Sequence, residues 1–317
     1  MSDIEYVPLT YLNESSLLPL MEEEAGTWLS DLDWDYSAIQ RVLLPFIRRN
    51  TLPGYAALDG NNRPIGYVFF LADRSKGSIG ALYTTPLNPP DKAQEIDDML
   101  VELAIACLHD SGDIRRIEAQ LFPFHGRNFG RIFGTHGFIC HPRHYLVRTI
   151  DANITEKEPE APAIIVHWDS ELIGQAAAMT IACYRNHPDY EILEDYGTPS
   201  NCENYLHGLI ANPGCGVFLP KASFMCLDGH GNLLGYVICS RISNGHAMIP
   251  QIASHPAWQG RGLGNAMMSH CLSQLRAMAF NSVSLVVTEK NSRAIEWYRK
   301  NEFHLRKEFS AFTWNRS

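Results

Sequence analysis

The segment with the strongest chemical signal is Gln259-Gly260-Arg261-Gly262-Leu263-Gly264. It follows an apolar run and the turn residue Pro256, and it opens a helical pattern. Glycines let the backbone approach a ligand closely, and the start of a helix presents unpaired N–H groups at the positive end of its dipole. Arg261 adds a cation. The pattern predicts a diphosphate-binding loop, and the alternative is a tight strand-to-helix turn without a ligand.

A second motif runs from Asn291 to Phe303. Asn291 follows the β-branched run 283–288 and is placed to cap the next helix. Tyr298 lies two helical turns further on, on the face that points back toward the end of the strand. Its phenol could protonate a leaving thiolate, because a thiol with a pKa of about 8.5 needs only a weak acid. The alternative is that Tyr298 packs beside Trp297 in a core.

The elements that must position these motifs occur twice in the chain. Each half has a strand, a second strand, a helix with apolar residues three and four apart, a β-branched strand, a shorter helix and a last strand. In the first half, the strands and the main helix are expected at 63–71, 78–86, 95–109, 114–121 and 144–150. In the second half, they are expected at 233–239, 247–256, 262–279, 283–288 and 307–314. The repeat predicts a duplicated mixed α/β domain, with a sheet flanked by helices and a central parallel β–α–β passage.

Residues 151–162 are expected to be a linker, because they are charged, contain two prolines and lack apolar periodicity. The sequence therefore predicts domains at 1–150 and 163–317. A length of 317 residues agrees with two domains.

The composition limits the partners. The formal net charge is −9 and neither half has an excess of basic residues, which argues against nucleic acid as a partner. No apolar run approaches the roughly 18 residues that a membrane span needs. The eight cysteines are scattered without a CxxC pair, which is typical of reduced thiols in a cytoplasm. No spacing of side chains indicates a metal site.

Together the two motifs resemble the GNAT superfamily of N-acetyltransferases, over about residues 163–314. The loop 259–264 fits the family's Q/R-x-x-G-x-G/A pattern. The family's following block is matched by Asn291, Ala294, Tyr298 and Phe303, with Glu302 where a glycine is usual. The resemblance implies two tandem GNAT-like α/β (α+β) domains with mostly antiparallel sheets. It also implies acetyl-CoA in a cleft between two splayed parallel strands, near 249–254 and 283–288.

The resemblance further implies roles for single residues. Tyr298 would be the general acid, and the N–H of Ile252 would polarise the thioester carbonyl. Contacts to acetyl-CoA would come from Ile252, Ala253, Ser254, Gln259, Gly260, Arg261, Gly262, Leu263, Gly264 and Asn291. The basic side chains that could meet the 3′-phosphate, or form an ordinary exposed helix face, are Lys290, Arg293 and Arg299.

The base and the acceptor site stay open. Pro250 and Gln251 stand where some members carry a catalytic glutamate. The alternatives are a water chain, His246, His255 or a carboxylate elsewhere. In the resembled fold the segment 184–196 lines the acceptor site. Its four carboxylates and three tyrosines could receive a cationic amine, or it could be a solvated loop.

The first half keeps the pattern of elements without the chemical groups. It has no Q-x-x-G-x-G loop after Pro86, and Pro89 and Pro90 remove N–H donors that a phosphate would need. Phe133 stands in the place of Tyr298. We therefore expect a degenerate GNAT-like repeat that does not bind acetyl-CoA.

These expectations favour an N-acetyltransferase that moves an acetyl group from acetyl-CoA to a primary amine of a small molecule or peptide by direct attack, without a metal. One alternative is a CoA-binding sensor or interaction module without turnover. Another is a tandem-type aminoacyl transferase that uses charged tRNA, which the net charge and the intact loop oppose. The oligomeric state is not predicted.

Overall fold

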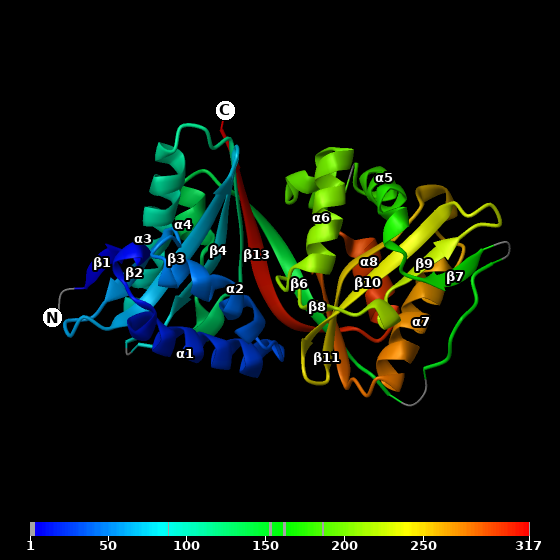
Figure 1. The fold of residues 1–317 in the computed structure, drawn as a ribbon, viewed down its shortest axis with the longest axis horizontal. Coiled ribbons are helices and arrows are strands. Elements are labelled where there is room, and N and C mark those ends of the chain that lie inside the picture. The colour runs from blue at the N-terminus through cyan, green and yellow to red at the C-terminus, as the bar shows by residue number, and fades with distance from the viewer. Residues whose placement is uncertain (1–3, 88, 152–153, 161–162, 186, 317) are drawn as a thin grey trace. The chain divides into compact units, whose positions relative to one another are not determined.

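The computed structural model describes residues 4–316 except 88, 152–153, 161–162 and 186 (Figure 1). The chain forms two compact units. Unit 1 consists of residues 1–32, 36–143 and 309–317, and unit 2 of residues 33–35 and 144–308.

Unit 1 contains these elements: β1 Glu5–Pro8, η1 Leu9–Tyr11, α1 Glu14–Leu32, α2 Ser37–Arg48, β2 Gly54–Leu58, β3 Pro64–Asp73, β4 Lys76–Thr84, α3 Pro90–Asp110, β5 Arg116–Leu121, η2 Phe124–Gly126 and α4 Gly130–Thr135, with the first part of β6 Ile139–Thr149. Strands β1 to β4 pair antiparallel in chain order, and β4 pairs parallel with β5. Along β3, Val68 faces the core under α3, whereas Tyr67 reaches Glu24 of α1. Successive side chains of β3 therefore point to opposite faces of the sheet, one covered by α3 and the other by α1.

Unit 2 contains these elements: β7 Ile164–His167, η3 Ser170–Leu172, α5 Ile173–Tyr184, η4 Pro188–Glu191, η5 Glu194–Gly197, α6 Pro199–Ala211, β8 Val217–Phe218, η6 Pro220–Ala222, β9 Phe224–Leu227, β10 Leu233–Ser243, β11 His246–Ser254, η7 Pro256–Trp258, α7 Leu263–Ala277, β12 Ser282–Thr288 and α8 Ser292–Lys300, with the first part of β13 His304–Asn315. Strands β7, β9, β10 and β11 pair antiparallel, and β11 pairs parallel with β12. Val237 and Cys239 face the core with α7, while Tyr236 and Ile238 face the core with α5 and α6. The sheet therefore lies between two helical layers.

The expected duplication, with its mostly antiparallel sheets and one parallel pair in each half, is confirmed. Each expected main helix and strand is present. The boundaries differ by five residues at the starts of β6, which begins at Ile139, and of α3, which begins at Pro90 because proline is well tolerated at the first position of a helix.

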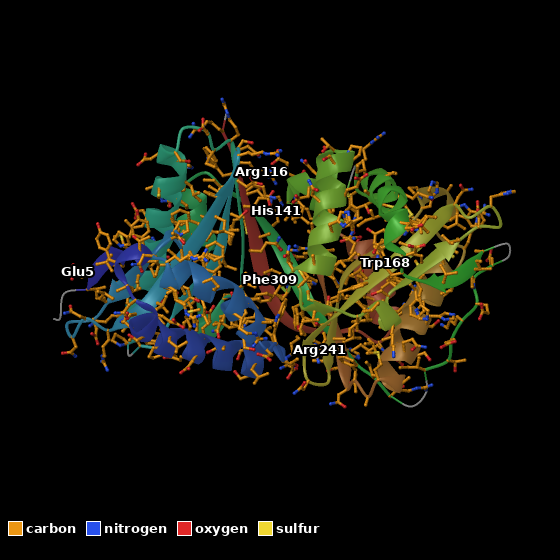
Figure 2. The ribbon with its side chains drawn as sticks, in the orientation of Figure 1. Glu5, Arg116, His141, Trp168, Arg241 and Phe309 are labelled. Atoms are coloured by element: carbon orange, nitrogen blue, oxygen red, sulfur yellow. The ribbon has the colours of Figure 1, made fainter. Side chains whose placement is uncertain are left out.

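The last strand divides the chain differently from the contiguous ranges 1–150 and 163–317. Residues Ser310–Asn315 of β13 pair antiparallel with β5, so the end of the chain belongs to unit 1. His141 Nε2 lies 2.8 Å from Thr313 Oγ1, and Phe309 stacks on Phe122 with ring centroids 4.2 Å apart (Figure 2). Pairing between strands is not local in sequence, and an alternating pattern does not identify the partner strand.

The expected linker lies partly outside the described residues, at 152–153 and 161–162. In its described part, Lys157 N donates to Ser269 Oγ (2.8 Å) and the Ile154 carbonyl accepts from Arg276 (3.1 Å). This segment is therefore held against α7. None of the described helices combines the length and the apolar character that crossing a membrane requires.

Candidate functional site

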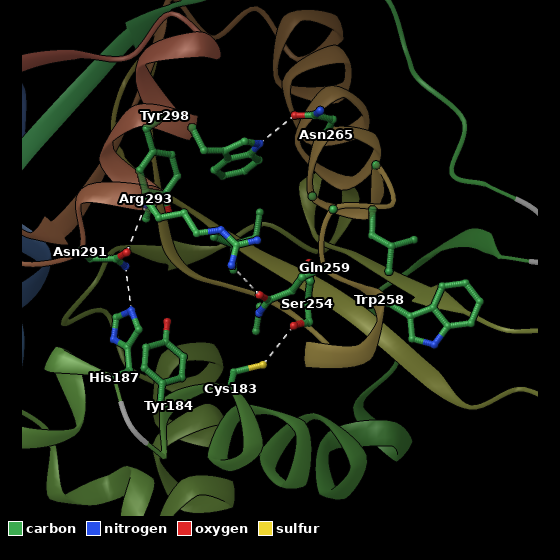
Figure 3. Close-up of a pocket in the computed structure, with 18 residues that line it drawn as sticks. Cys183, Tyr184, His187, Ser254, Trp258, Gln259, Asn265, Asn291, Arg293 and Tyr298 are labelled. Atoms are coloured by element: carbon green, nitrogen blue, oxygen red, sulfur yellow. Dashed lines mark hydrogen bonds between the residues drawn. The ribbon is translucent and has the colours of Figure 1, made fainter.

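Strands β11 and β12 diverge in unit 2. Their parallel pairing covers only His246–Met248 with Ser282–Ser284, although β11 continues to Ser254 and β12 to Thr288. A pocket of about 410 Å³ lies where the strands have separated, and it is lined from β11, η7, α7, α8 and the end of α5 (Figure 3). The splayed parallel pair predicted from the sequence is therefore present, with a pocket at its open end.

The start of α7 forms one wall of this pocket. Gly260 and Gly262 both have a φ of +81°, a left-handed conformation that glycine adopts without strain. Gly262 is the N-cap and no side chain caps the helix, so its first N–H groups are open to a ligand. Of the predicted loop, the residues that line the pocket are Gln259, Gly260, Gly262, Leu263 and Gly264.

Arg261 and Gly264 of this loop also contact residues other than a ligand. Arg261 does not line the pocket, and its guanidinium lies over the Trp258 ring at 4.9 Å from the centroid. Gly264 faces α8, where an added Cβ would be 3.2 Å from Cζ2 of Trp297. A small residue is therefore required at 264 by helix packing as well as by the pocket.

Arg293 supplies the cation that lines the pocket. It stands in the first turn of α8, and its Nη1 donates to Gln259 Oε1 (3.2 Å). Lys290 and Arg299, which were considered with it, do not line the pocket.

The predicted backbone contacts lie on β11. Ile252, Ala253 and Ser254 line the pocket, opposite Val237, Tyr236 and Gly235 of β10. Beyond Met248 this part of β11 is not paired with β12. The Ser254 carbonyl accepts the Cys183 thiol at 3.1 Å, and the other backbone groups on that side are available to hydrogen-bond a ligand.

Tyr298 lines the pocket from α8 and is 8% exposed. Its ring also contacts Trp297 and Phe303, at centroid distances of 4.9 and 5.7 Å. Tyr298 therefore packs beside Trp297, and it also lines the pocket. Burial, and then the negative charge of Asp189, raise the pKa of Tyr298 far above its usual value. The phenol is therefore protonated throughout the neutral range.

Asn291 caps α8, because its Oδ1 accepts the N–H of Ala294 (3.1 Å). Its Nδ2 lies 2.7 Å from His187 Nε2, and both residues line the pocket. Two residues after His187, the carboxylate of Asp189 accepts a hydrogen bond from Thr288 Oγ1 at the end of β12. These contacts join the segment after α5 to the diverged end of β12.

The two histidines considered as bases lie away from the pocket lining. His246 is 2% exposed at the paired end of β11, beside Ser282, and burial lowers its pKa to about 4. His255 accepts the N–H of Ala257 (3.2 Å) and caps η7. Neither residue lines the pocket, so neither is placed to act on a ligand bound there.

In its described part, which excludes residue 186, the segment 184–196 combines buried residues with exposed ones such as Glu191 and Glu194. Tyr184 and Tyr196 stack with ring centroids 4.4 Å apart, and Tyr196 and Asp189 are buried. Tyr184 and His187 of this segment line the pocket, whereas the sequence patterns missed Cys183, Trp258, Asn265 and Trp297 as pocket residues. Burial raises the pKa of Cys183 to about 11, so this residue is a thiol at neutral pH.

In unit 1, the region that corresponds to the pocket of unit 2 contains a buried ion pair and buried aromatic rings. Asp97 of α3 and Arg127 form a buried ion pair (3.0 Å), and Arg127 also donates to the Thr85 carbonyl (3.4 Å). Phe133 is fully buried and stacks on Phe312 at 4.2 Å. Pro89 is the N-cap of α3 and Pro90 is its first residue, and Asn88 lies outside the described residues.

Residues 184–303 match the acetyltransferase (GNAT) family. Solved structures resemble nearly the whole chain. A GCN5-related N-acetyltransferase from Sphaerobacter thermophilus is 15% identical, with a TM-score of 0.68 and coverage of 99% of this chain and 95% of that one. A tandem GNAT protein from the clavulanic acid biosynthesis pathway, solved without AcCoA, is 14% identical, with a TM-score of 0.59 and coverage of 99% and 98%.

A GNAT-family acetyltransferase from Colwellia psychrerythraea is 10% identical, with a TM-score of 0.57, and covers 99% of this chain and 100% of its own. At these identities the likeness concerns the fold, which is a tandem GNAT fold. No curated protein matches the sequence.

Proposed function

We propose that this protein moves an acetyl group from acetyl-CoA to a primary amine of a small molecule or peptide, and the match of residues 184–303 to the acetyltransferase (GNAT) family supports this. The observation that carries the proposal is the pocket of unit 2. It joins the uncapped start of α7, the unpaired edge of β11 and the hydroxyl-bearing ring of Tyr298. Unit 1, with its buried Asp97–Arg127 pair, is proposed not to bind the cofactor.

The residues present fit the phosphates of acetyl-CoA. The open N–H groups at Gly262, Leu263 and Gly264 suit a diphosphate, and the dipole of α7 favours its negative charge. Arg293 can turn from Gln259 to a phosphate oxygen. From this loop the pantetheine arm would follow β11 along Ser254, Ala253 and Ile252 toward Tyr298, and Asn291 would contact it from α8.

The chemistry follows from these positions. The lone pair of a neutral amine attacks the thioester carbon, the C–N bond forms, and the carbonyl π pair moves to oxygen. The N–H of Ile252 hydrogen-bonds this oxyanion. When the C–S bond breaks, Tyr298 gives its proton to the thiolate, the attacking nitrogen loses a proton to solvent, and Tyr298 regains one from solvent. The reaction releases the amide and free CoA.

The direct test is to incubate the protein with acetyl-CoA and a panel of primary amines and to follow free thiol and amide by mass spectrometry. Amine-dependent thiol release with formation of the matching amide is expected. If acetyl-CoA binds but no amine in the panel releases thiol, the non-catalytic CoA-binding alternative is favoured and the proposed activity is contradicted.

A further inference from the structure

Tyr184 faces the pocket from the side opposite Tyr298. It is the last residue of α5 and lines the pocket, while Tyr298 lines it from α8. Figure 3 shows the hydroxyl of Tyr184 directed into the space between the two rings. The function proposed above gives Tyr184 no role.

The Tyr184 oxygen receives a hydrogen bond from Gln251. The Gln251 side chain is 4% exposed, and its Nε2 donates to Tyr184 Oη at 3.2 Å. Its Oε1 accepts the hydroxyls of Tyr196 (3.2 Å) and Tyr205 (3.4 Å). Since an O–H group needs an acceptor, these two phenols set the amide with its oxygen toward them and its nitrogen toward Tyr184.

This orientation gives the chain of hydrogen bonds one direction. Tyr196 and Tyr205 donate to Gln251, and Gln251 donates to Tyr184. Because Tyr184 oxygen already accepts, its own O–H is left to donate toward the pocket. Such chains polarise each member, which strengthens the last donor.

The surroundings hold the Tyr184 ring and keep it protonated. The ring stacks on Tyr196, and its centroid lies 4.8 Å from that of His187 in an edge-on contact. Burial raises the pKa of Tyr184 well above its usual value, and the charges of Tyr196, Asp189 and Tyr298 add to this. A phenol in this state donates a hydrogen bond but does not release its proton near neutral pH.

We propose that the Tyr184 hydroxyl donates a hydrogen bond to the oxyanion of the tetrahedral intermediate, from the α5 side, and that Gln251 is the positioning residue that aims it. The proposal rests on the function proposed above and adds no covalent step. No proton moves to the oxyanion, and the bond strengthens as negative charge grows on that oxygen. It also gives a reason for an amide at 251: a carboxylate there could not donate to Tyr184.

Two substitutions test this. Tyr184→Phe removes the donor, and we expect kcat to fall by roughly 100-fold while the Kd for CoA stays within about threefold. At neutral pH, Gln251→Glu reverses the direction of the hydrogen bond between residues 251 and 184. The carboxylate cannot donate to Tyr184, so it accepts the Tyr184 O–H, which then no longer points into the pocket. We expect a comparable loss in kcat. Tyr11→Phe removes a phenol that is 79% exposed in unit 1 and serves as the control, with unchanged kcat.

The pH dependence of kcat in Gln251→Glu shows whether residue 251 positions the Tyr184 hydroxyl or only packs against it. In Gln251→Glu, the introduced carboxyl group can again donate to Tyr184 once it is protonated. The kcat of this variant relative to wild type should therefore rise by about tenfold or more as the pH is lowered from 8 toward 6. A ratio that does not change with pH, or wild-type kcat in Tyr184→Phe, would overturn the proposal while leaving the acetyltransferase intact. Absence of amine-dependent thiol release by the wild-type protein would overturn both.

Discussion

The ring of Tyr298 is packed against other aromatic rings, and the residue also lines the pocket. Its contacts with Trp297 and Phe303 fix the ring, and its burial beside the charge of Asp189 keeps the hydroxyl protonated. A general acid must carry its proton when the thiolate forms, and this environment guarantees that state below the alkaline range.

Replacing Tyr298 with Phe should therefore lower kcat by about 100-fold or more, because general acid catalysis contributes on that scale. The Kd for CoA should stay within about threefold, since the ring and its packing remain. Steady-state kinetics and calorimetry on the same preparation check both values. Thiol release at the wild-type rate would refute Tyr298 as the acid.

Unit 1 holds a buried carboxyl group, and its pKa predicts how stability depends on pH. Glu24 is 1% exposed and accepts hydrogen bonds from Tyr67 and Trp28. Burial raises its pKa from 4.5 to about 7. The folded state therefore binds a proton that the unfolded chain has released between these values. The resulting stabilisation is complete below pH 4.5 and is lost as the pH rises through about 7.

Glu24→Gln should remove this contribution. Relative to the variant, the wild-type protein should lose roughly 3 kcal/mol of unfolding free energy between about pH 4.5 and pH 8, because each pKa unit corresponds to about 1.4 kcal/mol. Urea unfolding of both proteins at several pH values measures the difference. Parallel stability curves for the two proteins would contradict a buried, titrating Glu24.

At the level of single residues, the sequence could predict the groups that follow local rules. Asn291 caps its helix and Gly262 adopts a left-handed conformation at a helix start, and both follow from residue type and position. The Gln251 network could not be predicted, because it joins side chains from β11, α5, η5 and α6 that only the fold brings together. The second constraint on Gly264, its contact with Trp297, is likewise a consequence of packing between helices.

Among the elements, α7 has the most direct link to the proposed function, because its first turn is both uncapped and exposed to the pocket. Its amphipathic pattern and its glycines define its start in the sequence. The divergence of β11 from β12 depends on how the two strands pair, and no residue pattern within either strand predicts it. The sequence alone indicated it only through resemblance to a family.

Gly264→Glu should abolish CoA binding, since a carboxylate at this helix start repels the diphosphate. Gly264→Ala is the matched variant. Its Cβ meets Trp297 at 3.2 Å without adding charge, so weaker but measurable binding is expected. Asp91→Asn, at the start of α3 in unit 1, should bind CoA like wild type. Calorimetry decides, and CoA binding by Gly264→Glu at wild-type affinity would show that the diphosphate lies elsewhere.

For the whole molecule, the feature with the largest consequence is the end of the chain. Periodicity placed strands at 144–150 and 307–314 as the last strand of each half, and both strands exist. The strand β13 does not simply close the second half, because from Ser310 onward it pairs with β5 in the sheet of unit 1. The last part of β13 therefore belongs to unit 1, and the last part of β6 belongs to unit 2. Neither contiguous half of the sequence contains all the strands of its unit.

Phe312→Ala tests this assignment in the intact chain. Phe312 is 2% exposed and stacks on Phe133, so its truncation should cost unit 1 about 3–5 kcal/mol. Hydrogen exchange should accelerate in β5 and α4, whereas α7 and α8 keep their protection and CoA still binds. Loss of protection confined to α7, β12 and α8 would place this strand in the other unit.

The central claim is that the start of α7 holds the paired phosphates of CoA and directs the sulfur toward Tyr298. A crystal structure of the CoA complex measures this directly. We expect diphosphate oxygens within hydrogen-bonding distance of the backbone nitrogens near Gly262–Gly264, the pantetheine arm along β11, and the sulfur beside the Tyr298 hydroxyl. CoA bound at another surface, or with its sulfur directed away from Tyr298, would contradict it.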